Sequence, residues 1–455
     1  MRRAATICKY AHVQRIFVFS VLLFGFMAIR APSTDAKGAF QVKQLPNGVH
    51  VILAPDHRYP QVAVIARYYA GVRHEPPGKF GLAHLLEHVS FRPPRPEAIT
   101  TINVAADSSH GQNASTHPDF TQYYHLEPPY RLRTALWEER WRLTAMPMRW
   151  SASDVEWERP IVRNEGRYRG ETHPHHTSKL KMFEALFPAT HPFRGLVDAA
   201  GRDLASLTFA DVKQFFERWY VPSNTWIAVI GDFQEPAASA MIDAYFGSLA
   251  AAATPPVPAL PDPTLHAETL IENVDPLAPR PLLMMAWHTP ALFKPFDAEA
   301  DLLAVMLGQA RASRLRGEGT KAAWVHAQQM STSAGSVFTL EAEPLEGVSL
   351  EELKQDIDAR LVGFKAVPPA DRDLDRATRA LLRDTFERME GTLSSGQALI
   401  DVAANVGDVD PVSLQRSRYT AVTGASMRKF IETYLRLDQR VVVFSRPVTM
   451  AKASQ

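Results

Sequence analysis

The alternation of apolar and polar residues predicts strands and helices that interleave along the chain. Asn47-Gly48 lies between two short alternating runs and is typical of a hairpin turn, and the β-branched run over residues 61–69 indicates a strand. Apolar residues at helical spacing predict helices over residues 79–91, 130–145, 161–186 and 208–220. Later in the chain, a capping-box pattern at Ser349 and Glu352 predicts a helix to residue 364, and another helical pattern covers residues 369–388. This order indicates an α+β fold, an α/β sandwich with helices on one side of a sheet.

The chain reads as two similar halves. Residues 250–266 are rich in alanine and proline, a composition that disfavours helix and favours an extended spacer. A pattern of a capped helix and an apolar strand that begins at Leu207-Thr208 recurs in the second half at Val422-Thr423, although two ordinary helix–strand units could share it by coincidence. We therefore expect an N-terminal domain over residues 37–249, a linker over 250–266 and a similar C-terminal domain over 267–455.

The first 36 residues have the pattern of a secretory signal. Basic residues precede an uncharged apolar run that extends from Ile16 to Ile29. This is shorter than the roughly 20 residues that span a bilayer. Cleavage after Ala36 would send the chain to the periplasm or outside the cell with no stable membrane span, whereas an uncleaved signal would anchor it in the membrane. The only cysteine, Cys8, precedes the run, so the mature chain would hold no disulfide.

Composition changes this picture little. The 455 residues, 46% of them hydrophobic, suffice for two cores of ordinary size. Fifty Lys and Arg residues balance 49 Asp and Glu residues, so net charge gives no reason to expect nucleic acid or an anionic membrane as partner.

Candidate chemistry is concentrated in the segment 81–88, where His84, Glu87 and His88 form an H-x-x-E-H pattern. In a helix the two histidines project from one face and Glu87 flanks them. Imidazole suits zinc, and a catalytic zinc typically has three protein ligands and a water. The pattern therefore predicts a zinc site in which Glu87 is the general base rather than a ligand. The alternative is a chance match on a solvated helix face.

A third ligand must come from elsewhere, and the candidates are Glu158 and Glu165. Their spacing in the sequence would place them two turns apart on one face of a helix. Pro160 lies between them and tends to kink a helix, so they share a face only if Pro160 falls in the first turn or the kink is small. Carboxylates on helices are also often only solvated.

His84-x-x-Glu87-His88, followed further along the chain by Glu165, resembles the pitrilysin/insulinase-type zinc metallopeptidases. These are inverzincins, to which mitochondrial processing peptidase is related. The flanks agree: Asn47-Gly48, the approach over residues 71–81, the segment 111–116 with Asp119 and Thr121, and residues 219–222 with Gly231-Asp232. The likeness covers nearly the whole mature chain.

The resemblance implies two similar domains, each a sheet with helices on one side, that close like a clamshell around a peptide. It implies that His84, His88 and Glu165 bind one zinc ion per chain. Glu87 would be the catalytic base and Glu158 a supporting carboxylate. The peptide would lie extended along an edge strand that comprises Asn113, Ala114, Ser115 and Thr116.

One departure from the family pattern lies in the second half of the chain. The second half of such enzymes commonly contributes an arginine and a tyrosine that contact the substrate. Residues 308–316 offer Arg314 and Arg316, but Trp324 stands where the tyrosine is expected. An indole has one donor and no hydroxyl, so it replaces a phenol poorly at an oxyanion. Either the chain is a weak enzyme alone, or a homologous partner subunit or a second copy supplies the missing groups.

The leading hypothesis is an exported zinc endopeptidase that hydrolyses peptides or unfolded segments. The alternative is a non-catalytic or weakly active subunit of a heteromeric peptidase, and a metal-dependent hydrolase of non-peptides is a third hypothesis. His173, His175 and His176 could capture a transition metal, but their spacing implies no fixed geometry and favours an exposed loop.

Overall fold

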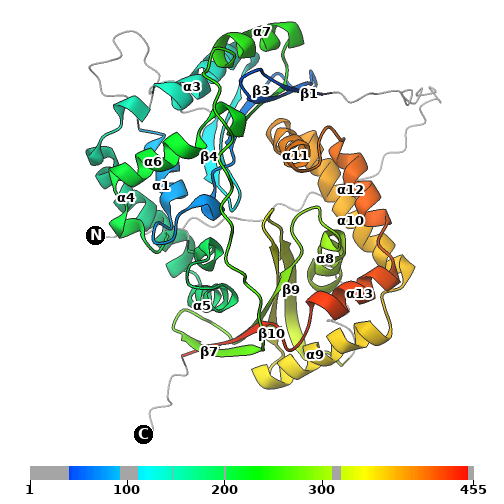
Figure 1. The fold of residues 1–455 in the computed structure, drawn as a ribbon. Helices are drawn as coiled ribbons and strands as arrows, with labels where there is room; N and C mark the ends of the chain where they lie inside the picture. Colours follow the sequence, from blue (N-terminus) through cyan, green and yellow to red (C-terminus); the bar gives the residue numbers. More distant parts are fainter. Residues whose placement is uncertain (1–39, 93–110, 146, 199–200, 310–318, 449–455) are drawn as a thin grey trace, which may run out of the picture. The chain divides into compact units, whose positions relative to one another are not determined.

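The computed structural model of the chain describes residues 40–92, 111–145, 147–198, 201–309 and 319–448, in which two mixed sheets carry helices (Figure 1). The predicted signal over residues 1–36, and Arg314 and Arg316, lie outside these residues. In the described part of the chain, no helix is long and apolar enough to cross a membrane. The α+β class predicted from the sequence is confirmed.

The first sheet has six strands in the order β1-β2-β6-β3-β5-β4. The pair β2 and β6 is parallel and the other neighbours are antiparallel. β1 and β2 flank the predicted hairpin at Asn47-Gly48. The strands are β1 (Gln41–Gln44), β2 (His50–Pro55), β3 (Val62–Tyr68), β4 (Gln112–Thr116), β5 (Thr121–Glu127) and β6 (Thr225–Gly231).

The second sheet repeats the last five positions of the first, in the order β7-β11-β8-β10-β9. Its parallel pair is β7 and β11, which corresponds to β2 and β6, and β9 takes the edge position of β4. The strands are β7 (Thr269–Asp275), β8 (Leu282–Thr289), β9 (Ala322–Met330), β10 (Ser336–Pro344) and β11 (Val441–Pro447). All strands of the first sheet precede residue 250 and all strands of the second follow residue 266, although the domain boundaries themselves stay a prediction.

The helix–strand repeat found in the sequence has the same structure in both halves. Helix α6 (Phe209–Trp219) precedes β6, and helix α13 (Gly424–Tyr434) precedes β11. Each helix begins at a threonine, Thr208 or Thr423, whose hydroxyl accepts a hydrogen bond from a backbone N–H of the first turn. The shared pattern therefore reflects equivalent places in two like folds.

Four of the remaining helices, over residues 82–89, 132–144, 350–366 and 371–390, lie where the sequence predicts them, whereas the four over residues 235–246, 297–304, 392–405 and 411–420 were not predicted. The remaining helices are α1 (Leu82–Val89), α3 (Leu132–Thr144), α4 (Ala152–Gly166), α5 (His176–Leu186), α7 (Glu235–Phe246), α8 (Asp297–Ala304), α9 (Leu350–Ala366), α10 (Asp371–Glu390), α11 (Thr392–Asn405) and α12 (Pro411–Thr420).

The single helix predicted over residues 161–186 is wrong. Two helices, α4 and α5, occupy this region, and a π-helical turn over residues 167–171 follows α4. The true start is at Ser151, which forms a capping box with Asp154. Pro160 lies inside α4 rather than at its first turn, so the pattern around this proline mimics a helix start.

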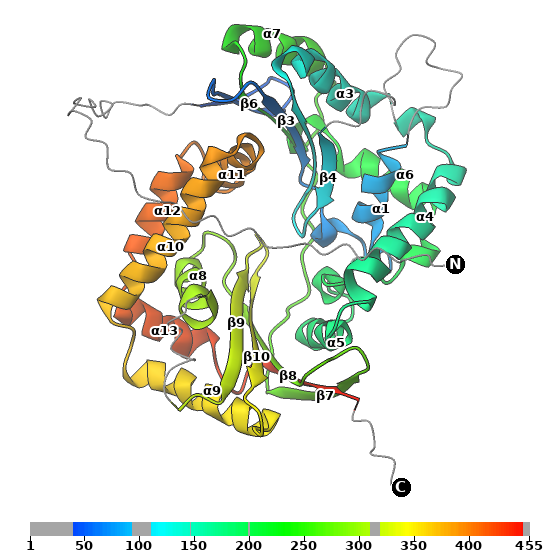
Figure 2. The same ribbon diagram turned by 180° about the vertical axis from the view of Figure 1, so that it is seen from behind.

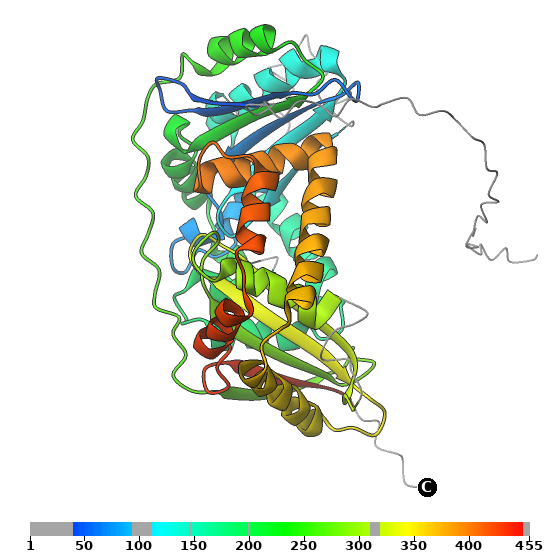
Figure 3. The same cartoon turned by 90° about the vertical axis from the view of Figure 1, so that its right-hand side faces the viewer.

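Each sheet has helices of its own half on one face, as predicted, but one helix from the other half covers the opposite face (Figures 1, 2 and 3). Leu399 and Ile400 of α11 pack against Ile65 and Ile230 of the first sheet. Met182, Phe183 and Leu186 of α5 pack against the second sheet. Sequence periodicity shows only that a helix has an apolar face, not which sheet covers it, so this exchange was not predicted.

The N-terminus of α1 is held by a buried carboxyl group. Glu75, which is 5% exposed, accepts hydrogen bonds from the backbone N–H groups of Gly81 at 3.0 Å and Ala83 at 2.8 Å. These are among the N–H groups that a helix leaves without an internal partner. Burial raises the pKa of Glu75 to about 8, although the two N–H groups oppose this and the nearby charge of Asp203 adds to it.

This pKa predicts a pH dependence of stability. The folded chain keeps the Glu75 proton up to about pH 8, whereas the ordinary value is 4.5, so the free energy of unfolding should fall as pH rises through this window. Glu75→Gln removes the ionisation. Its melting temperature should therefore fall less between pH 5 and pH 8 than that of the native chain. Glu217→Gln, at an exposed position of α6, is the control and should follow the native curve. Equal losses in the native chain and Glu75→Gln would contradict the assignment.

Candidate metal centre

Helices α1 and α4 pack against each other and bring three predicted metal ligands together. One ligand atom from each of His84, His88 and Glu165 lies within 4.8 Å of the others. Oε2 of Glu165 is 2.9 Å from Nε2 of His88 and 3.7 Å from Nε2 of His84. Within the described ranges, this is the one group of three or more histidine, cysteine or acidic side chains with such spacing.

The donor set fits zinc. Two ligand atoms each about 2.1 Å from a tetrahedral ion lie about 3.4 Å apart, and the two distances from Glu165 to the imidazoles fall on either side of this value. Two imidazole nitrogens and one carboxylate oxygen are also a set found in catalytic zinc sites, where a water takes the fourth position. The three side chains could therefore hold zinc after small movements.

Glu158 contacts the other side of the His88 ring. Its Oε2 lies 3.4 Å from Nδ1 of His88, while Nε2 of the same ring faces Glu165. A carboxylate that accepts from the second ring nitrogen fixes the orientation of a metal-binding histidine. Burial lowers the pKa of His88, but the hydrogen bond to Glu158 and the charges of Glu165 and Glu87 outweigh it, and the net shift is upward. Although Pro160 lies between them, Glu158 and Glu165 share a face because α4 continues through this proline.

Two arginines near these carboxylates were not singled out by sequence reasoning. Arg169 pairs with Oε1 of Glu165 at 2.5 Å, and Arg92 lies 3.4 Å from Oε1 of Glu158. The i,i+4 spacing of Glu165 and Arg169 could have indicated the first pair. Arg92 comes from the segment after α1, and no local signal relates it to Glu158.

Glu87 lies beside the three ligands but outside their cluster. It is 8% exposed, and its Oε2 accepts a hydrogen bond of 2.6 Å from the hydroxyl of Thr116 on β4. The contact connects α1, the metal helix that carries His84 and His88, to strand β4. The carboxylate is thereby oriented near the site without serving as a ligand in the group of three.

Strand β4 lies at the edge of the first sheet, paired with β5 alone among the described strands. It carries all four predicted substrate contacts, Asn113, Ala114, Ser115 and Thr116. Asn113 is exposed, whereas Ala114 packs against the core and Ser115 lies 3.0 Å from a ring nitrogen of His117. The edge position leaves one side of this strand available for a further strand, and its contact with a peptide stays a prediction.

The other candidates are not members of this group of three. Trp324 is on β9, 40% exposed and stacked on His326. His175 contacts the hydroxyl of Ser445 at 2.8 Å, and in the described residues the histidines at 173, 175 and 176 form no metal-binding group.

Comparison with known proteins shows similarity to peptidases and zinc proteases. Residues 206–381 match the family model described as "Peptidase M16 inactive domain", a span that does not include the H-x-x-E-H segment. The chain is 22% identical over 448 residues to the zinc protease PqqE of Helicobacter pylori, with 96% of this chain and 100% of the relative covered. It is 27% identical over 247 residues to the probable zinc protease PqqL of Escherichia coli. This match covers 50% of this chain and 24% of that protein.

Solved structures show the same fold. The crystal structure of a protease from Helicobacter pylori matches with a TM-score of 0.78 at 21% identity, over 90% of this chain and 99% of that one. The first half of the periplasmic protease PqqL from Escherichia coli matches with a TM-score of 0.73 at 18% identity, over 90% and 92%. Together with the H-x-x-E-H helix and the repeated sheets, these likenesses make the chain similar to the M16 family of pitrilysin-like peptidases.

Proposed function

We propose that the chain is an exported zinc-dependent endopeptidase that hydrolyses peptides or unfolded segments. The observation that carries the proposal is the approach of His84, His88 and Glu165 to one another, with Glu87 beside them and outside the ligand group. A purely structural relative would have no need of a carboxylate poised next to three metal ligands. The names of the relatives, zinc proteases, support the same chemistry.

Different residues of the chain have different roles in the proposed hydrolysis. Zinc, when bound by His84, His88 and Glu165, supplies a Lewis acid and lowers the pKa of water at its open position. Thr116 donates to Oε2 of Glu87, so we assign proton transfer to Oε1. Glu87 takes a proton from the attacking water there and later gives it to the leaving amine.

The edge strand β4 is suited to hold the substrate. An extended peptide that adds to an exposed sheet edge gains main-chain hydrogen bonds with little demand on its sequence. Thr116 at the end of β4 contacts Glu87, so a peptide along Asn113 to Thr116 would pass beside the base. Broad sequence preference follows from this mode of binding.

Localisation of the chain outside the cytoplasm is part of the same proposal. The relative PqqL of Escherichia coli is described as periplasmic. The N-terminal pattern of the chain is that of a cleaved signal, which would release the mature chain without an anchor.

A second candidate is a weakly active subunit that needs a homologous partner, or a second copy of the chain. Trp324 favours it, because an indole has no hydroxyl and is a poor replacement for the expected phenol at an oxyanion. The two candidates differ in one respect that can be measured: the first requires peptide cleavage by the purified chain alone, whereas the second requires cleavage to rise sharply when the partner is added.

The mature chain should contain about one zinc ion per molecule, and Glu87→Gln should lower cleavage of a quenched peptide by at least about 100-fold. Removal of the base leaves the three ligands in place, so the zinc content of this variant should equal that of the native chain. Elemental analysis and a fluorescence assay measure the two quantities. A native chain free of zinc and inert both alone and with a partner would refute the proposal.

The two carboxylates of α4 should differ in their effect on metal. Glu165→Gln removes a ligand and should abolish tight zinc binding, whereas Glu158→Gln weakens only the support of His88 and should lower zinc affinity by about 10- to 100-fold. Titration against a chelator measures both affinities. Glu156→Gln, an exposed position on the same helix, is the matched control and should bind zinc as the native chain does. Unchanged affinity in Glu165→Gln would remove it from the ligand set.

A further inference from the structure

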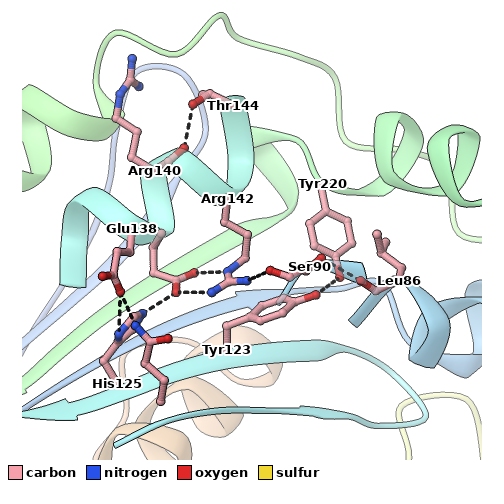
Figure 4. Close-up of polar contacts among 11 residues, drawn as sticks. Leu86, Ser90, Tyr123, His125, Glu138, Arg140, Arg142, Thr144 and Tyr220 are labelled. Atoms are coloured by element: carbon pink, nitrogen blue, oxygen red, sulfur yellow. Dashed lines mark hydrogen bonds and ion pairs between the residues drawn. The ribbon is translucent and has the colours of Figure 1, made fainter. Parts of the chain in front are cut away.

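Beneath the C-terminal end of the metal helix lies a chain of buried charged side chains that the proposed reaction does not use (Figure 4). Arg142 and Glu139 come from α3, and His125 comes from β5. The three are 4%, 0% and 1% exposed. Charged groups are almost never buried to this extent unless they are paired, and their desolvation is costly.

Arg142 contacts the metal helix directly. Its Nη1 donates a 2.7 Å hydrogen bond to the carbonyl oxygen of Ser90, the residue that ends α1, and the Ser90 hydroxyl donates to the carbonyl of Leu86. Carbonyl groups at a helix C-terminus have no partner in the helix and carry partial negative charge, so a buried cation stabilises them. His88 lies in the last turn that this contact holds.

The guanidinium is fixed from its other side. Oε2 of Glu139 lies 3.1 Å from Nε of Arg142, and Nε2 of His125 donates to Oε1 of Glu139 at 2.6 Å. Burial raises the pKa of Glu139, but the charge of Arg142 and the hydrogen bond from His125 outweigh it and bring the pKa down to about 2. Both members of the pair are therefore ionised at neutral pH.

The same chain continues to the strand proposed to hold the substrate. Nδ1 of His125 lies 3.5 Å from Oε2 of Glu138, and the amide of Gln112 on β4 donates to that oxygen. Gln112 directly precedes the four predicted substrate contacts. A series of polar contacts thus runs from β4, through β5 and α3, to the end of α1, although the 3.5 Å approach of His125 to Glu138 is not a hydrogen bond.

We infer that Arg142, held by Glu139 and His125, is a positioning residue that fixes the end of the metal helix relative to the substrate strand. The inference rests on the proposed function, because it concerns the same metal ligands and the same strand. Arg142 is outside the proposed ligand set, and it acts through the Ser90 carbonyl on the helix turn that bears His88.

Arg142→Met tests the inference. Loss of the bond to Ser90 should lower zinc affinity and kcat each by about tenfold, which is the lower end of the effect of losing a supporting contact at a metal site. KM should stay within about twofold of the native value. Gln112→Leu removes the hydrogen bond from β4 to Glu138 at the other end of the series. It should raise KM severalfold without a change in zinc affinity. Chelator titration, steady-state kinetics with a quenched peptide and thermal unfolding give the readouts.

Arg440→Met is the matched control. Arg440 is also fully buried and pairs with Asp358 at 2.5 Å and Glu268 at 2.6 Å, but it lies in the second half. Its replacement should lower the melting temperature as Arg142→Met does and leave zinc affinity and kcat unchanged. If the two variants behave alike in all three readouts, Arg142 contributes to stability alone and the inference fails, while the proposed function stands.

The double variant Glu139→Gln/Arg142→Met separates stability from positioning. It removes the carboxylate charge together with its partner, so the melting temperature should recover relative to Arg142→Met. Zinc affinity should stay low, because the contact with Ser90 is still missing. Recovery of both would overturn the inference. A native chain that binds no zinc would instead refute the proposed function, and the inference with it.

Discussion

The packing of α1 against α4 is the interaction on which the rest of the site depends. Two imidazoles on one short helix can grip only one side of an ion, and the carboxylate that completes the set comes from a different helix, distant in the sequence. The structure meets this requirement by fixing α1 at both ends, with Glu75 at its N-terminus and Arg142 at its C-terminus. A helix of eight residues has little stability of its own, so these buried partners and the core beneath it decide where its histidines point.

The two halves share one topology but carry different side chains at equivalent places. In the second half, the helix that follows β8 is α8, which occupies the place of α1 in the order of elements. Instead of imidazoles it carries Asp297, fully buried and paired with Arg418 at 2.6 Å. The exchanged helices α5 and α11 then make each half contribute to the core of the other.

The sequence was informative where the signal is local. The hairpin at Asn47-Gly48, the capped helices at Thr208 and Ser349 and the histidine pair all depend on residues within one or two turns of each other. The helix boundary near Pro160 was misplaced because proline is favoured at a helix start, whereas Pro160 lies inside α4, where proline is disfavoured.

Long-range contacts could not be read in this way. The link from Arg142 to Ser90 and the contact of Arg92 with Glu158 join residues 52 and 66 positions apart, and no periodicity in the chain encodes them. The proximity of Glu165 to the histidines was inferred from family resemblance rather than from spacing, since the residues alone left Glu158 and Glu165 equally open.

Anomalous diffraction at the zinc edge from crystals of the mature chain tests the central claim most directly. The account predicts one strong peak about 2.0–2.2 Å from Nε2 of His84, Nε2 of His88 and an oxygen of Glu165, with Glu87 outside bonding distance. A zinc-loaded crystal whose peak lies elsewhere, or whose Glu165 points away from the imidazole pair, would contradict it.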